Sequence, residues 1–308
     1  MKNFLLSLLL LIVLGTLPAP VCAWWDTGHM TVAAVAYARL TPAVRTWVDE
    51  LIPVLTAHYS GTRNFIESAT WPDDIKNDGV YIYSALHYTN IPYNPDGVAL
   101  PAHAQPEINV VSAIKTMAII LRSRKAIALE KARALAFLVH FVGDIHQPLH
   151  TTSMYTKEQP EGNLGGNRFR LSDSAHNSLH KLWDDGCGFF DPWKPQISRE
   201  PWGEPTEKAL LAIADSVARL YPESEMPAAR NLDPVIWAEE GHALAVKYGY
   251  EGVQLIDGEG IKIPIRPGDD PSALYLGAGQ KIVQQQVALA GYRLARMLNE
   301  IHDGGADD

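Results

Sequence analysis

The sequence predicts an all-α fold in which many helices pack as one domain with one or two minor β-hairpins. Over most of the chain, apolar residues recur at the spacing of three and four residues that places them on one helical face. Segments that alternate apolar and polar residues, as half-buried strands do, are few and short. Since neither a linker nor a repeat divides the chain, we expect one large domain with an ample core.

Eight segments carry the helical pattern, and residues at their ends support it. Thr41 followed by Pro42 is typical of a helix start, with an N-cap and then proline at the first helical position. The long fourth segment should stop or kink near Pro148, because proline cannot continue a helix. We expect helices over Gly28–Leu40, from Pro42 onward, and over Pro106–Arg124, Ile127–Ile145, Ser178–Trp183, Glu207–Tyr221, Pro234–Tyr248 and Ser272–His302.

Three other segments lack the helical pattern. Thr152–Ser174 is rich in Gly and Asn, and its piece Asn167–Leu171 alternates as a small strand or hairpin would. Val253–Ile265 predicts a second hairpin around the turn Asp257–Gly260. The closing residues, 304–308, predict a disordered acidic tail.

Residues 1–23 have the three parts of a secretory signal peptide: a basic start, an apolar run over residues 4–17, and small residues at Val21 and Ala23. An uncleaved membrane anchor is the alternative, but the apolar run is about half a dozen residues too short to span a bilayer comfortably. We therefore expect cleavage before Trp24, a mature domain over residues 24–303, and a secreted or periplasmic protein.

The net charge and the cysteine count limit how this protein can bind nucleic acid and what can stabilise its fold. The formal net charge of −9 argues against gripping a nucleic-acid duplex over a broad surface, which needs a basic face. Any phosphate must then be attracted locally. Cys22 would leave with the signal peptide, so Cys187 has no partner for an intramolecular disulfide, and packing and bound metal must hold the fold.

Histidines and aspartates recur at a spacing that suits metal binding. His140 and Asp144 are four residues apart, so they project from one helical face and can bind a common cation. His150 would lie about 120° further around a continuing helix, which places it better for a second metal. The same spacing recurs in His180 and Asp184, and imidazole with carboxylate is a ligand set that suits zinc.

The remaining histidines are interpreted more plainly. A lone buried histidine is more often a core residue than a ligand, which is our interpretation of His58, His103, His176, His242 and His302. His146 lies inside the dense motif and has two open interpretations. It orients a metal ligand through a hydrogen bond, or it only packs.

These residues, in this order, resemble the zinc-dependent single-strand nucleases of the S1/P1 type, which share a helical fold with the bacterial zinc phospholipases C. The resemblance covers nearly the whole mature chain. It implies that Trp24 binds zinc through its α-amino nitrogen and carbonyl oxygen, and that His29, Asp73 in A-T-W-P-D and His87 in L-H-Y are ligands. With the motifs above, nine ligating residues result: Trp24, His29, Asp73, His87, His140, Asp144, His150, His180 and Asp184.

The family arrangement implies three Zn²⁺ ions per chain. The first would be held by Asp73, His87, His140 and Asp144. The second, bridged to the first by Asp144, would be held by Trp24 and His29, and the third by His150, His180 and Asp184. Three Zn²⁺ with three aspartates leave a local charge of about +3, which suits a phosphodiester.

The resemblance also implies a mechanism and a base-binding site. A metal-bridging hydroxide would attack phosphorus, with Asp73 orienting or deprotonating it and Lys76 neutralising charge on the phosphate. Tyr88 would stack on a base. Asn90 stands where better-studied members have an aspartate that bonds the base, which leaves base preference undecided, and Asn167 in a Gly-Gly-Asn run is a further candidate contact.

The implied function is an endonuclease on single-stranded DNA and RNA that leaves 5′-phosphates and also acts on 3′-nucleotides. A zinc phospholipase C acting on phospholipid is the alternative enzyme, although the last ligand, Asp184, is a glutamate in the phospholipases. A non-catalytic zinc-binding protein is the third reading, and it requires closed coordination shells. No obligate protein partner is evident.

Overall fold

The computed structural model describes residues 24–173, 175–256 and 258–304, and over these residues it confirms the predicted all-α class. The predicted signal peptide, Asp257 of the predicted turn and residues 305–308 lie outside this part of the chain, and Gly304 is the last residue of α10. The described α-helices are α1 (Asp26–Tyr37), α2 (Pro42–Thr56), α3 (Phe65–Ser68), α4 (Trp71–Asn77), α5 (Val110–Arg122), α6 (Ala128–Ile145), α7 (Leu179–Asp184), α8 (Glu204–Leu220), α9 (Pro234–Leu244) and α10 (Ala273–Gly304).

Shorter helical turns link these helices. The 3-10 turns are η1 (Tyr81–His87), η2 (Pro148–His150), η3 (Gly186–Gly188), η4 (Lys194–Gln196), η5 (Glu223–Glu225) and η6 (Pro227–Arg230), and η7 (Ala245–Tyr250) is a π-helical continuation of α9. The prediction missed α3, α4 and the 3-10 turns. Each is too short to show a clear period in the sequence.

Side-chain caps explain where the predicted helices begin. At the start of α2, the Thr41 hydroxyl accepts a hydrogen bond from the Val44 amide at 3.3 Å. The helix predicted from Pro106 begins at Val110 instead, because Asn109 accepts bonds from the next amides and Ser112 bonds back to the Asn109 amide. The start predicted for this helix was wrong because that capping box lies inside the predicted range.

The long helix α6 is the centre of the core. Its residues from Ala134 to Ile145 are all buried, and it contacts α1, α2, α4, α5, α9 and α10. It ends at Ile145, and the chain continues as the turn η2, whose first residue is Pro148. The predicted stop near Pro148 is therefore confirmed, and it turns the chain so that His150 faces back toward α6.

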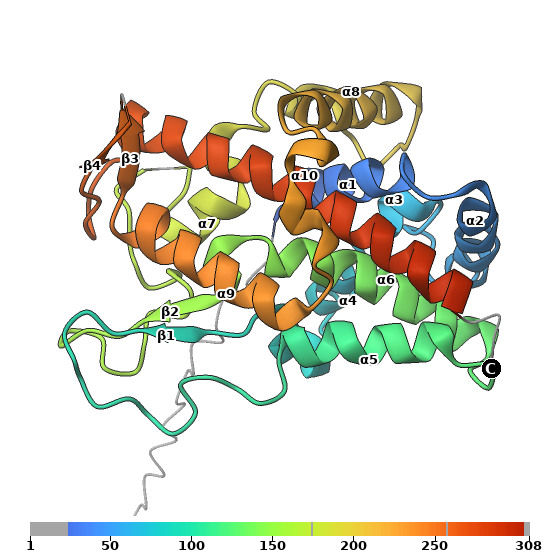
Figure 1. The fold of residues 1–308 in the computed structure, drawn as a ribbon, viewed down its shortest axis with the longest axis horizontal. Helices are drawn as coiled ribbons and strands as arrows, with labels where there is room; N and C mark the ends of the chain where they lie inside the picture. Colours follow the sequence, from blue (N-terminus) through green and yellow to red (C-terminus); the bar gives the residue numbers. More distant parts are fainter. Residues whose placement is uncertain (1–23, 174, 257, 305–308) are drawn as a thin grey trace, which may run out of the picture.

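The long helix α10 runs across the molecule, between α8 and α5 in the view of Figure 1. It packs closely on α1, because Gly291 has no side chain to separate the two helices. A Cβ built on Gly291 would lie 2.4 Å from Cγ1 of Val35. This close contact fixes α1, and with it the position of His29.

Two small sheets complete the fold. β1 (Ile91–Tyr93) pairs in parallel with β2 (Thr152–Met154), and β3 (Val253–Ile256) pairs antiparallel with β4 (Glu259–Lys262), as the predicted hairpin requires. The strand predicted over Asn167–Leu171 is wrong, since these residues form turns apart from one bridge between Arg170 and Ser178. The Asn167 side chain donates to the Leu164 carbonyl, and this turn overrides the alternating pattern.

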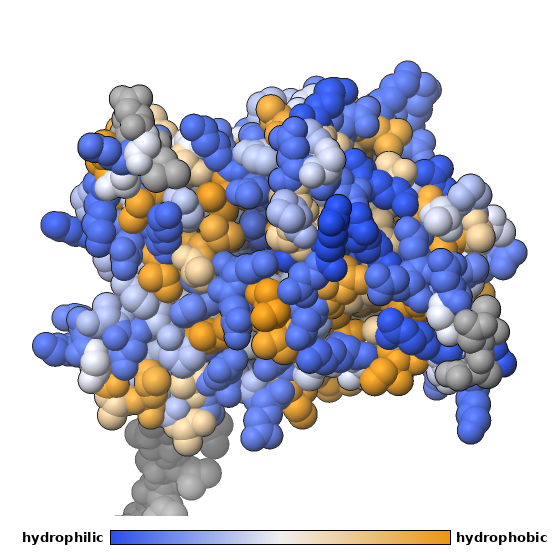
Figure 2. Space-filling view, in the orientation of Figure 1, coloured by the Kyte–Doolittle hydropathy of each residue, from blue (hydrophilic) through white to orange (hydrophobic). Residues whose placement is uncertain are grey.

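Figure 2 shows one face of the molecule as mostly hydrophilic, with hydrophobic residues scattered among the charged ones. Among the described residues, no helix has both the length and the apolar character needed to cross a membrane.

We predict that Gly291→Ala lowers the free energy of unfolding by about 1–3 kcal/mol, because the added methyl must push α10 away from α1. Gly277→Ala on the same helix is the matched control. Its Cβ would meet nothing within 4 Å, so higher helix propensity should raise stability by up to about 1 kcal/mol. Thermal unfolding of both variants measures the difference, and equal shifts would contradict the packing argument.

Candidate metal centre

Imidazole and carboxylate side chains from six separate segments converge in the interior. Within the described residues, three groups have ligand atoms that all lie within 4.8 Å of one another. His140 belongs to two of the groups, and every member is buried. The groups are His29 with Asp73 and His140, His87 with His140 and Asp144, and His150 with His180 and Asp184.

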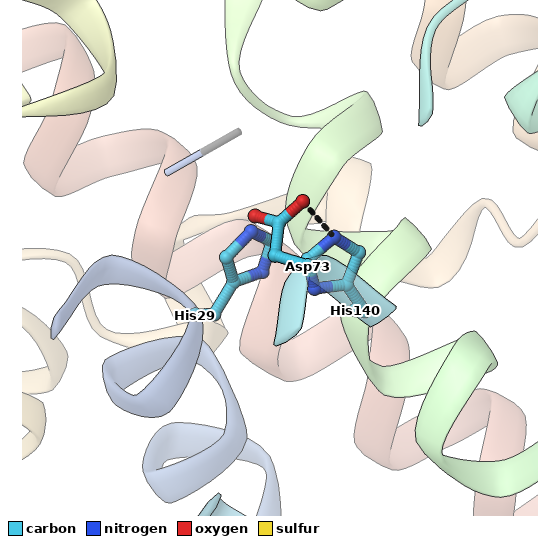
Figure 3. A group of neighbouring side chains, drawn as sticks. All are labelled: His29, Asp73 and His140. Atoms are coloured by element: carbon cyan, nitrogen blue, oxygen red, sulfur yellow. Dashed lines mark ion pairs between the residues drawn. The ribbon is translucent and has the colours of Figure 1, made fainter. Parts of the chain in front are cut away.

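Helix geometry brings the first residues together. On α6, Nε2 of His140 lies 3.3 Å from Oδ2 of Asp144, one turn further on. Helix α1 adds His29, whose ring stacks on His140 with centroids 3.8 Å apart. Figure 3 shows Asp73, from α4, facing both rings, with its Oδ1 3.9 Å from Nε2 of His140. Helices α1 and α4 therefore each add one candidate metal ligand to the pair His140 and Asp144 on α6.

The β1–β2 pairing joins this cluster to the next. His87 ends η1, just before β1, and its Nδ1 lies 3.0 Å from Oδ2 of Asp144. His150 ends η2, just before β2, and its Nε2 lies 3.6 Å from Oδ1 of Asp184. The Thr89 amide bonds the His150 carbonyl at 2.9 Å, so the parallel strands hold the two histidines side by side.

Backbone carbonyls fix the orientation of three of the rings. Nδ1 of His140 donates to the Ala69 carbonyl, Nδ1 of His150 to the His87 carbonyl, and Nδ1 of His180 to the Gly165 carbonyl, each at 2.7 Å. Because a carbonyl can only accept, the proton is on Nδ1. The Nε2 lone pair of each ring therefore faces the cluster, as in histidines that bind metal.

Many of the other ring and carboxylate atoms at this place lack hydrogen-bond partners. Buried atoms without a hydrogen bond include both ring nitrogens of His29, Nε2 of His87, His150 and His180, both carboxylate oxygens of Asp144, and Oδ1 of Asp73. Folded proteins rarely leave buried polar atoms unpaired, and here they gather at one place. Divalent cations would satisfy all of them, so the residues fit a multinuclear metal centre.

Burial sets the protonation of the histidines in this cluster. Burial lowers the pKa of His140 to about 3 and that of His180 to about 4. It also lowers the pKa of His29 well below its ordinary value. These rings are neutral near pH 7, which is the form that binds a metal.

Burial acts on the carboxyl groups in the opposite sense. It raises the pKa of Asp73 to about 7 and that of Asp184 to about 6, and it raises the pKa of Asp144 well above its ordinary value. Buried carboxylates are costly without a counter-charge, and a cation would supply it.

Two other predicted residues lie beside the clusters. Trp24 is fully buried, its indole nitrogen donates to the Gly143 carbonyl at 2.9 Å, and the next amide, of Trp25, donates to the Asp184 carbonyl. Trp24 is therefore anchored to both ligand-bearing helices, α6 and α7. The Lys76 side chain is buried, with Nζ 3.7 Å from Oδ1 of Asp73.

The residues predicted to bind a nucleobase are less deeply buried than the candidate metal ligands. Tyr88 follows His87 in extended conformation and is half-buried. Asn90 is half-buried and has a positive φ of 54°. Asn167 is half-buried, and its amide bonds the Leu164 carbonyl, so part of its hydrogen-bonding capacity closes a turn.

Sequence reasoning missed Gln147 as a supporting residue. Its side-chain amide donates to Oδ1 of Asp184 at 2.6 Å, and its Oε1 accepts from the Leu149 amide at the same distance. Gln147 thereby orients a candidate ligand on another helix. Its place between Asp144 and His150 in the motif was the signal that could have identified it.

His146, in contrast, points away from the ligand clusters. Its Nδ1 donates to the Val142 carbonyl, its Nε2 accepts from Arg293, and its ring packs against Trp237. None of these contacts involves a predicted ligand. Of the two interpretations of His146, packing matches the contacts of the described structure.

This mostly helical chain gathers in its core three groups of side chains that could bind metal, and comparison with known proteins identifies its family. The family model described as S1/P1 Nuclease matches residues 24–303. Endonuclease 2 of Arabidopsis thaliana is 28% identical over 304 residues, covering 90% of each chain. Nuclease P1 of Penicillium citrinum is 26% identical over 300 residues, covering 91% of this chain and 98% of its own. Nuclease S1 of Aspergillus oryzae is 25% identical over 296 residues, covering 90% of this chain and 91% of its own.

The chain therefore belongs to the S1/P1 nuclease family. It is a hydrolase that acts on phosphoester bonds, and its family is metal-dependent.

We predict that the buried carboxyl groups release protons when Zn²⁺ is added to the metal-free protein at about pH 5.5, and that this carboxyl contribution is lost at about pH 8. In the metal-free state, the raised pKa values keep Asp73 and Asp184 protonated below about 7 and about 6, respectively. The histidines are already neutral at pH 5.5 and contribute few protons. Zinc affinity should accordingly weaken as pH falls through this window.

Calorimetry in buffers of different ionisation enthalpy measures the proton release. Asp184→Asn should reduce the release at about pH 5.5, because it removes one titrating carboxyl. Equal release from wild type and Asp184→Asn at about pH 5.5 would contradict this account of the site.

Proposed function

We propose that this chain is a zinc-dependent phosphodiesterase that cuts single-stranded DNA and RNA internally to leave 5′-phosphates, and that it also acts on 3′-nucleotides. The observation that carries the proposal is the convergence of buried, unpartnered imidazole and carboxylate atoms in three adjoining groups. Family membership supports a nuclease.

Zinc is the metal that this ligand set favours. Neutral imidazole with carboxylate suits Zn²⁺, and the arrangement of the groups suits three ions. Two would share Asp144, and the third would be held by His150, His180 and Asp184. Zinc bound there would supply Lewis acidity and would lower the pKa of a bound water molecule to near neutrality.

The chain's own residues would complete the chemistry. Asp73 lines an open cavity beside the cluster, where its carboxylate can orient a water molecule and accept its proton. The ammonium group of Lys76 lies close to the Asp73 carboxylate. It can therefore also reach an oxygen of a phosphate that is bound beside Asp73. Tyr88 provides a ring on which a splayed base can stack, which favours single strands over duplexes.

The position of Trp24 supports a processed enzyme. The S1/P1 match begins at Trp24, the residue expected to follow the signal peptide. We propose that removal of residues 1–23 leaves the Trp24 α-amino group as a metal ligand. The mature protein would then be secreted or periplasmic.

We predict that purified protein starting at Trp24 hydrolyses RNA and single-stranded DNA, leaves 5′-phosphates, and releases phosphate from nucleoside 3′-phosphates. Chelation of zinc should abolish all three activities. The same preparation is offered phosphatidylcholine. Efficient lipid cleavage without nucleotide release would replace this proposal with a phospholipase C, and zinc binding without either activity would leave a non-catalytic zinc-binding protein.

We also predict that one extra alanine before Trp24 costs about one zinc per chain and most of the phosphodiesterase rate, while unfolding remains cooperative. An amide nitrogen cannot bind zinc as the free α-amino group does. Removal of the alanine with an aminopeptidase should restore both zinc content and rate. An extended protein with three zincs and full rate would show that Trp24 is not a ligand.

A further inference from the structure

We propose that a cavity of about 640 Å³ beside Asp73 is a second nucleobase subsite, built on Trp25. It would take the base of the nucleotide that lies across the scissile phosphate from Tyr88. This inference rests on the proposed function, since it concerns a polynucleotide bound at the same centre.

The cavity joins the candidate metal centre through Asp73. Trp25, Asp26 and Thr27, at the start of α1, form one wall, and Asp73 and Asn77 of α4 form another. The segment 194–200 closes the third side. A ligand in this space therefore sits next to the carboxylate that we place in the chemistry. Its volume is in the range of small-molecule sites.

Trp25 is the feature that points to a base. Its side chain is 37% exposed, although the preceding residue, Trp24, is fully buried. Its ring stacks on His176, with centroids 5.9 Å apart and planes at 30°. Lys194 Nζ lies 5.0 Å from the ring centroid. The indole is therefore held by its neighbours while part of its surface opens into the cavity.

The residues behind Trp25 are themselves fixed. The His176 ring nitrogens bond Asp173 at 2.6 Å and Asp185 at 2.7 Å. Lys194 bonds the same Asp185 at 2.6 Å. An aromatic ring held in place before binding loses little entropy when a ligand stacks on it.

The opposite wall is tied to both helices. Arg199 donates to Asp26 of α1 at 3.1 Å and to Asp74 of α4 at 2.8 Å. Its carbonyl accepts a hydrogen bond from Arg63 at 2.6 Å. These bonds keep the cavity formed without a ligand.

The charges of the lining favour a base over a phosphate. The lining holds three carboxylates (Asp26, Asp73 and Glu200) and two cations (Lys194 and Arg199). Both cations are already paired with aspartates. A phosphate would gain little here, whereas an uncharged base can stack on the indole. The carboxylates of Asp26 and Glu200 can accept hydrogen bonds from its amino groups.

The two aromatic residues belong to different parts of the site. Tyr88 lies between η1 and β1, whereas Trp25 caps α1. In the hydrolysis, water oxygen bonds to phosphorus, the P–O3′ bond breaks, and O3′ leaves with a proton. The nucleoside with the free 3′-hydroxyl would lie at Tyr88. The nucleotide with the new 5′-phosphate would lie at Trp25.

The test compares two substrates with the same base. The dinucleotide ApA offers two bases, whereas adenosine 3′-phosphate offers only the one assigned to Tyr88. We expect Trp25→Ala to lower the ratio of kcat/KM for ApA to kcat/KM for adenosine 3′-phosphate by about 5- to 150-fold, the fold-change that base stacking is worth. Trp25→Phe, which keeps a ring, should hold the ratio within about threefold of wild type.

Trp47→Ala is the matched control, since Trp47 is a partly buried tryptophan on α2 that packs against His302. It should leave the ratio unchanged. If Trp25→Ala lowers both rates equally, with or without loss of zinc, Trp25 only supports the metal centre and the subsite is refuted. An unchanged ratio with unchanged rates refutes it as well. Wild-type protein that cleaves neither substrate would instead overturn the proposed function itself.

Discussion

The structure depends on burying imidazole and carboxylate groups that no protein atom satisfies. The unpartnered oxygens of Asp144 and nitrogens of His29 lie in the interior of a helical core, where an isolated ionised group is costly. The backbone carbonyls of Ala69, His87 and Gly165 orient three further rings toward the same place. Metal bound by these groups would therefore tie the helices together in a chain whose one described cysteine, Cys187, is free.

Local spacing predicted the parts of the site that lie within single helices. The pairs His140 with Asp144 and His180 with Asp184 follow from helical geometry alone. The approach of His29 and His87 to them depends on contacts between distant segments, such as Gly291 against Val35 and the β1–β2 pairing. No periodicity in the sequence carries that information, so only the family resemblance could supply it. The fold class, in contrast, follows from helical periodicity repeated along the chain.

The errors lie where short-range chemistry overrides periodicity. Asn167–Leu171 was expected to form a small strand or hairpin, but this part of the chain forms turns, and Gly165 and Gly166 just before it have positive φ. A Cβ on Gly165 would lie 2.6 Å from the Leu149 carbonyl, so glycine is required for this approach. The turn brings the Gly165 carbonyl to His180, which makes this segment part of the metal centre's support.

An acidic nuclease must attract a polyanion, and the arrangement of groups explains how this chain can do so. With a net charge of −9, the surface as a whole repels phosphates, and the cavity beside Asp73 holds more carboxylates than cations. Positive charge concentrated at bound metal would hold the scissile phosphate, while stacking on Tyr88 and Trp25 would add affinity that needs no charge. Stacking requires unpaired bases, so under the proposed function this division between metal for phosphate and rings for bases would itself select single strands. A broad basic surface would bind duplexes as well. The acidic net charge argues against such a surface, which is consistent with a preference for single strands.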